Sequence, residues 1–133
     1  ATHPGIYVHG SKFGREAAEL LFISELSVNP GAVGLSIVHC YCFATPVITY
    51  AGTHDGPNHH PEIEYLQDGI NGRFLEPNVE SLKKGLADLL GEPKRLAEME
   101  RAALKTAQVD CDLKNAVNGF RSAHKYVLKQ TSN

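Results

Sequence analysis

The segment best suited to binding chemistry runs from Asn29 to Ser36 and has the sequence NPGAVGLS. It joins a short β-branched run to a long apolar run, so we predict the turn between a strand and a buried helix. Gly31 and Gly34 permit unusual backbone angles and the close approach of a ligand. The helix behind them would direct unpaired N–H groups and its positive dipole end at the turn. This pattern indicates a backbone-made site for a phosphate or a sugar hydroxyl, but a plain strand-to-helix connection has the same pattern. It is neither G-x-G-x-x-G nor a Walker loop.

A second group of polar side chains lies in and just after the loop predicted from Ala51 to His60. It contains His54, Asp55, His59, His60 and Glu62. A zinc site needs ligands that converge on one ion, typically at helical i, i+4 spacing or on facing strands. Adjacent histidines in a loop with glycine and proline do not guarantee that convergence. We expect the solvated rim of an active site and no metal ligand. A zinc site and a contact surface for an acceptor or a partner domain remain as alternatives.

The sequence does not favour nucleophilic or redox chemistry. Ser36, His39 and Cys40 are not part of a G-x-S-x-G nucleophile elbow. Cys40 and Cys42 lie two positions apart in a predicted helix, where residues do not share a face. We therefore expect both to be small core hydrophobes rather than a metal or redox pair. An odd number of cysteines, three, fits a reducing cytosolic compartment better than a secreted one.

The elements that would position these groups alternate between strand and helix. Predicted strands cover Gly5–His9, Leu26–Asn29, Pro46–Tyr50 and Arg73–Leu75, and predicted helices cover Phe13–Ser24, Val33–Phe43, a short helix from Pro61, Leu82–Leu90, Leu96–Ala107 and Val117–Val127. Such alternation predicts an α/β, Rossmann-like three-layer domain. Its mostly parallel sheet has about four strands flanked by helices, and its last third is helical. The helix from Val33 has no polar stripe, so we expect it to be buried all round. Ligands of such sheets bind at the carboxyl ends of the strands.

Composition narrows the classes of protein. A chain of 133 residues, 42% of them hydrophobic and 21% charged, fits one soluble globular domain. The formal charge of −2 gives no basic field for a nucleic acid. No apolar run approaches the roughly 20 residues that span a bilayer. The first ten residues, ATHPGIYVHG, lack the layout of a signal peptide. We expect a cytoplasmic protein, at most at the inner face of the membrane.

Two blocks of the sequence resemble a known family. The run PGAVGLSIVHCYCFATPVITY is similar to the signature P-S-x-x-E-G-F-G-L-x-x-x-E-A-M-A-x-G-x-P-V-I of family-four retaining glycosyltransferases of the GT-B type. It matches at Gly34-Leu35 and at Pro46-Val47-Ile48. The second block, from Pro61 to Leu75, resembles the family's PE-x-I-x-DG-x-NG segment with one residue added. The likeness runs from about Gly5 to Leu90 and implies a domain that binds a nucleotide-sugar donor.

The chain departs from the signature at its two glutamates. These would fall at Gly31 and His39, and neither is acidic. In the family, one carboxylate faces the transferred sugar and the other faces the ribose. Here Gly31 offers only its backbone, whereas His39 can donate or accept toward a ribose hydroxyl. A buried core histidine is the alternative for His39. The PG-x-VGL…H pattern is similar to a bacterial capsule and lipopolysaccharide branch of the family.

The resemblance implies donor contacts from the residues Gly31, Ala32, Val33, Gly34, Leu35, Ser36 and His39, and assigns no catalytic residue. It also implies that residues 1–133 are a partial donor domain. The first two strand–helix units, with the basic residues that grip the pyrophosphate, and the N-terminal acceptor domain would be absent. No metal is expected, and the donor would be a UDP- or GDP-sugar. The full-length enzyme would transfer a hexose to a glycan or glycolipid and associate peripherally with a membrane, whereas this fragment would be inactive alone.

One alternative to the enzyme is a Rossmann-like module that binds a nucleotide or a partner protein without catalysis. The absent strands also have a structural consequence. Residues Ile6–His9 would pair directly with Leu26–Asn29, pair with another chain, or leave an open sheet edge through which the fragment dimerises.

Overall fold

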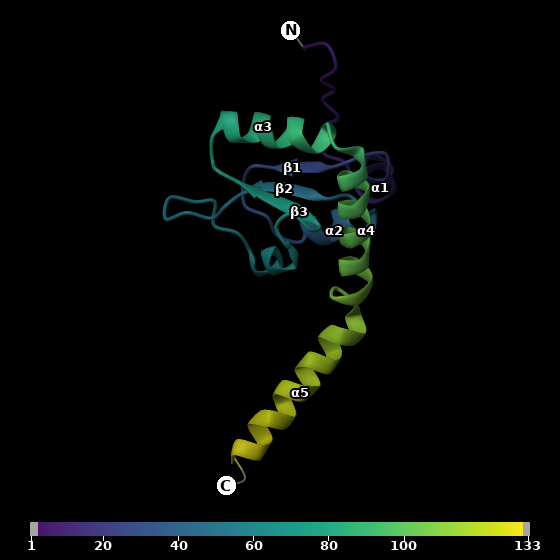
Figure 1. Cartoon of the computed structure of the whole chain (residues 1–133). Helices are drawn as coiled ribbons and strands as arrows, with labels where there is room; N and C mark the ends of the chain where they lie inside the picture. Colours follow the sequence, from purple (N-terminus) through teal and green to yellow (C-terminus); the bar gives the residue numbers. More distant parts are fainter. Residues whose placement is uncertain (1–2, 132–133) are drawn as a thin grey trace.

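The computed structural model describes residues 3–131 and has the alternating order of an α/β protein (Figure 1). In chain order the elements are α1 (Gly14–Phe22), β1 (Ser27–Asn29), α2 (Ser36–Cys42), β2 (Val47–Tyr50), the 3-10 helix η1 (Pro61–Tyr65), β3 (Gly72–Leu75), α3 (Val79–Leu90), α4 (Pro93–Val109) and α5 (Leu113–Thr131). The predicted Rossmann-like class and the helical C-terminal part are confirmed.

The sheet is parallel and has the order β1-β2-β3, with Val28 paired with Ile48 and Thr49 with Phe74. The strand predicted at Gly5–His9 is wrong. Its segment is coil, and the side chains of Tyr7 and Val8 are 80% and 82% exposed. A strand needs a hydrogen-bonded neighbour, and this run has none. Within residues 3–131, no strand pairs with the outer edge of β1, so that edge is open.

Helices cover both faces of the sheet (Figure 1). On one face, Ile37 and Tyr41 of α2 pack with Val47 of β2 and Ala103 of α4. On the other face, Leu89 of α3 and Met99 of α4 pack with Ile48 and Leu75 of the sheet. Because α4 contributes to both clusters, it holds the two faces together at one end of the sheet.

Helix α2 is buried on one side only, which corrects the expectation of burial all round. Ile37, Cys40 and Tyr41 are buried, whereas His39 and Cys42 are exposed. The interpretation of His39 as a core histidine is therefore wrong, and Cys42 is not a core residue. Burial raises the pKa of the Cys40 thiol, so this cysteine remains an inert thiol at neutral pH.

A left-handed residue ends α2. Ala44 has a φ of 58°, its N–H donates to the Tyr41 carbonyl, and the Thr45 N–H donates to the Cys40 carbonyl. These are the two hydrogen bonds of a Schellman motif. The turn brings the chain directly into β2 beneath the helix.

A buried amide ties three elements together. The Asn71 side chain accepts from the Tyr41 hydroxyl and from the Gln67 N–H, at 2.9 and 2.8 Å. It donates to the Tyr65 carbonyl and to the Thr106 hydroxyl, at 2.9 and 3.0 Å. Burial raises the pKa of the Tyr41 phenol, so the hydroxyl remains a donor. All four hydrogen-bonding positions of the amide are used, and η1 is fixed against α2 and α4.

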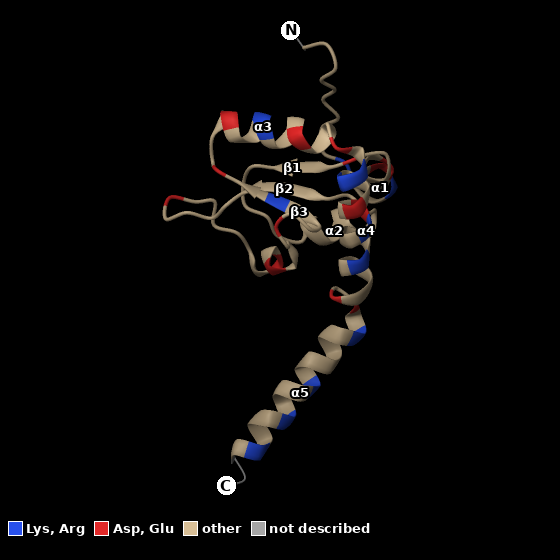
Figure 2. Ribbon diagram, viewed as in Figure 1, with Lys and Arg blue, Asp and Glu red and all other residues tan. Residues whose placement is uncertain are grey.

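Helix α5 extends away from the sheet (Figure 1), and residues 113–130 are all exposed. Its charged residues are Lys114, Arg121, Lys125 and Lys129, with no acidic residue among them (Figure 2). No helix within residues 3–131 combines the length and apolar character needed to cross a membrane.

Candidate functional site

Two loops follow the carboxyl ends of adjacent parallel strands and therefore meet at one edge of the sheet. Residues 30–35 follow β1, and residues 51–60 follow β2. This edge is where an α/β sheet of this kind binds its ligands. We therefore treat it as the candidate site.

The first of these loops begins with an asparagine turn. The Asn29 carbonyl oxygen Oδ1 accepts from the Gly31 N–H at 3.1 Å, and Nδ2 donates to the Ala32 carbonyl at 3.4 Å. An Asx turn of this kind stabilises the reversal of the chain locally. The Gly31 amide is consequently already occupied by a protein acceptor.

The loop glycines do not have the unusual backbone angles expected from the sequence. Gly31 and Gly34 are not among the residues with positive φ. What Gly34 provides instead is space, because a Cβ at this position would lie 3.4 Å from the His60 ring. The absence of a side chain lets the two loops approach each other closely.

His59 connects the two loops. Its Nδ1 accepts from the Val33 N–H at 3.1 Å, and its Nε2 lies 2.9 Å from the carbonyl oxygen of Tyr50 at the end of β2. The ring also packs at a tilt against Phe74 of β3, with centroids 6.2 Å apart. One half-buried side chain thus contacts the carboxyl-end region of all three strands.

The backbone of the next residue completes this contact. The His60 N–H donates to the Val33 carbonyl at 2.9 Å, so both backbone polar groups of Val33 bond to the second loop. Within residues 3–131, the N–H groups of Gly34, Leu35 and Ser36 donate to no protein acceptor. These three amides remain available to a ligand.

The structure separates His39 from the rest of the predicted site. Residues Gly31 to Ser36 lie together in and after the β1 loop, where Val33 is fully buried and Leu35 is 62% exposed. His39 instead lines a largely apolar hollow of about 590 Å³ between α1 and α2, with Lys12, Phe13 and Cys42 among its walls. None of residues 31–36 lines this hollow. The expected contact of His39 with a ribose hydroxyl stays a prediction.

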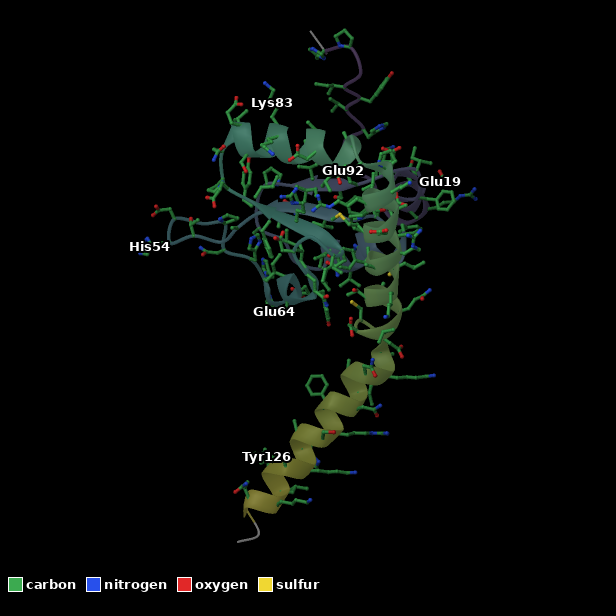
Figure 3. The ribbon with its side chains drawn as sticks, in the orientation of Figure 1. Glu19, His54, Glu64, Lys83, Glu92 and Tyr126 are labelled. Atoms are coloured by element: carbon green, nitrogen blue, oxygen red, sulfur yellow. The ribbon has the colours of Figure 1, made fainter. Side chains whose placement is uncertain are left out.

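The histidine-containing loop does not behave as one unit. His54 and Asp55 lie at its exposed tip, and the His54 side chain points away from the body (Figure 3). His59, by contrast, is half-buried and contacts Val33 and Tyr50. No group of three or more metal-ligating side chains is assembled within residues 3–131. Part of the loop therefore fits the expected solvated rim, and part of it is structural.

The edge carries no positive side chain. Residues 30–35, 51–60 and 76–78 contain Asp55 and Glu76 but neither lysine nor arginine. A diphosphate bound here would be matched by backbone amides alone. Cations for a diphosphate would have to come from outside these loops.

The role of His59 is not visible in the sequence. This residue belongs to a ligand-like group of histidines along the chain, whereas its contact with Val33 joins residues 26 positions apart. Gly34 carried an indirect signal. A glycine in the loop between a strand and a helix can mark a place where another segment approaches the backbone closely.

Among the comparisons with known proteins, the structural one agrees with the observed architecture. No protein family and no curated protein matches the sequence. A solved glycosyltransferase from Rickettsia africae ESF-5 is similar in structure, with a TM-score of 0.64 and 20% sequence identity over 83% of this chain. The chain has a glycosyltransferase-like fold. It spans 29% of the length of that structure.

Proposed function

We propose that this chain is part of the nucleotide-sugar-binding domain of a retaining, GT-B-type glycosyltransferase, in which it binds the donor for hexosyl transfer to a glycan or glycolipid. The observation that carries the proposal is the loop after β1, which presents the unoccupied amides of Gly34, Leu35 and Ser36 at the carboxyl edge of a glycosyltransferase-like sheet. Hydroxyl and phosphate oxygens are the acceptors that such amides favour.

Because this edge of the sheet has no lysine or arginine, the proposed donor site would be divided between this chain and other parts of a longer polypeptide. The donor pyrophosphate would be held by basic residues in two strand–helix units that precede this segment in a longer polypeptide. An N-terminal domain of that polypeptide would hold the acceptor. The open edge of β1 is where a further strand could pair, and in the isolated fragment it is where two copies could meet.

Titration calorimetry with a panel of UDP- and GDP-sugars tests donor binding by the 133-residue chain and by the longer polypeptide. We expect weak saturable binding by the chain and tighter binding by the longer protein. Gly34→Val should weaken donor binding, since added methyl groups would press against the His60 ring. The control Gly119→Val places the same side chain in open space. If the longer polypeptide neither hydrolyses nor transfers any sugar of the panel, the enzyme proposal fails.

That outcome would leave the second candidate, a Rossmann-like module that binds a nucleotide or a protein without catalysis. Gly31 and His39 stand where the resembling family has glutamates, and this substitution favours the second candidate. The two differ in turnover rather than in binding. A nucleotide that binds with no sugar transferred by the longer polypeptide supports the module.

We also propose that the longer enzyme associates peripherally with a membrane through α5. The exposed apolar residues Val117, Phe120 and Val127 lie on one face of this helix, and its four basic residues lie together along one side of that face. The rest of the chain has nine basic and 15 acidic residues, since the totals are 13 and 15 and α5 holds four basic and no acidic ones. Such a helix is complementary to anionic lipid.

A further inference from the structure

His59 is the side chain that holds the candidate donor loop in place, and both of its ring nitrogens are used in doing so. Nδ1 faces an N–H group of the backbone and so must carry a lone pair. Nε2 faces a carbonyl oxygen and so must carry the proton. Only the neutral Nε2–H tautomer satisfies both contacts. The ring is therefore a structural connector in this conformation rather than a metal ligand or a general base.

The two contacts of His59 have different consequences for the candidate site. The contact with Tyr50 anchors the imidazole to the end of β2. The contact with the Val33 N–H fixes the Ala32–Val33 peptide unit. The His60 N–H holds the Val33 carbonyl, which belongs to the next peptide unit and shares its plane with the Gly34 N–H. The two peptide units on either side of Val33 are therefore both restrained. The orientation of the next amides, those of Gly34 and Leu35, depends on that restraint.

We propose that His59 is the positioning residue of the donor site. It sets the direction of the loop amides through Val33 and does not touch the donor itself. This inference rests on the proposed function, because it assigns His59 a role in binding a nucleotide sugar. The ring of Phe74 also packs against His59 and limits the rotation of the imidazole. Through His59, the loops after β1 and β2 thus become one rigid unit.

Two conservative variants separate the two contacts. Asparagine at position 59 places an amide oxygen close to the position of Nδ1, so His59→Asn keeps an acceptor for Val33 and loses the bond to Tyr50. Glutamine places its amide nitrogen close to the position of Nε2, so His59→Gln keeps the bond to Tyr50 and loses the acceptor for Val33. Each variant removes one hydrogen bond, and similar unfolding midpoints in urea are expected for both.

Binding of a UDP- or GDP-sugar to these variants distinguishes positioning from general stabilisation. We expect His59→Asn to stay within about threefold of the parent affinity and His59→Gln to lose about tenfold, in line with one lost hydrogen bond. Rescue by asparagine but not by glutamine is the signature of a role through Val33. If both variants bind equally well, or lose affinity equally, the proposal is overturned.

Two measurements without ligand test the positioning role of His59 independently of the proposed function. Two-bond ¹H–¹⁵N correlation spectra of the parent chain should show His59 as the Nε2–H tautomer. Hydrogen exchange at the Val33 amide should be faster by about tenfold in His59→Gln than in His59→Asn. If these results appear but no sugar binds, the contact holds and the proposed function fails. An Nδ1–H tautomer, or equal exchange in the two variants, would refute the positioning role directly.

Discussion

The Nδ1 atom of His59 accepts a hydrogen bond from the Val33 N–H at 3.1 Å, although the two residues are 26 positions apart in the chain. The contact joins the loop after β1 to the loop after β2, at the edge where an α/β sheet binds its ligands. Neither loop has regular structure of its own. The site is therefore a property of the pair of loops, and its geometry depends on a half-buried side chain rather than on glycine conformations.

Removal of the Asn71 amide should destabilise the fold strongly. Asn71→Ala leaves the Tyr41 hydroxyl, the Gln67 N–H and the Tyr65 carbonyl without their buried partner. We expect a loss of about 3 kcal/mol in the free energy of unfolding, measured in urea. Asn118→Ala removes the same amide from an exposed position on α5 and should change stability by less than about 0.5 kcal/mol. Equal effects of the two variants would contradict this account.

Ala44→Gly should stabilise the protein. Ala44 has a φ of 58°, a region that disfavours a Cβ. Glycine relieves that strain at a helix end, and we expect a gain of about 1 kcal/mol. Thermal unfolding of the variant measures it. The same change at Ala116, inside α5, should have the opposite sign, because glycine disfavours a helix interior. A loss of stability on Ala44→Gly would refute the strain argument.

The sequence predicted most of the elements because their signals are local. The apolar run of Pro46–Tyr50, the proline at the start of η1 and the leucine stripe of α3 each indicate their own structure without reference to the rest of the chain. The predicted strand at Gly5–His9 failed for the opposite reason. Its composition is that of a strand, but whether a strand forms depends on a pairing partner that residues 3–131 do not supply.

The candidate site was predicted in part. The loop from Gly31 to Ser36 follows from the strand-to-helix junction, and its position at the sheet edge follows from parallel topology. The exposure of His39 could not be predicted, because an all-apolar helix can still leave one flank uncovered. The role of Asn71 could not be predicted either, because two of its four partners, Tyr41 and Thr106, lie 30 and 35 positions away in the chain.

Gly72→Ala should disrupt the sheet. A Cβ at Gly72 would lie 2.4 Å from the Val47 carbonyl oxygen and 3.0 Å from Leu66, so backbone rather than a flexible side chain would have to move. We expect a loss of about 3 kcal/mol, at the upper end for overpacking. The matched variant Gly119→Ala adds the same methyl group in open space within α5 and should stabilise that helix by up to about 1 kcal/mol. Circular dichroism during urea unfolding separates these outcomes, and a neutral Gly72→Ala would show that the sheet has more room than the structure indicates.

Vesicle binding should depend on the basic residues of α5. The chain should co-sediment with vesicles that contain phosphatidylglycerol and phosphatidylcholine, and little of it should co-sediment with vesicles of pure phosphatidylcholine. The reason is that each cation near an anionic surface contributes about 1 kcal/mol of binding free energy. Lys125→Glu with Lys129→Glu should reduce binding at least about tenfold by the same principle. Lys83→Glu with Lys105→Glu changes the net charge equally but leaves α5 intact, and should bind like the parent. If both double variants lose binding equally, net charge rather than α5 is responsible. If the parent chain does not bind anionic vesicles, the membrane proposal is wrong.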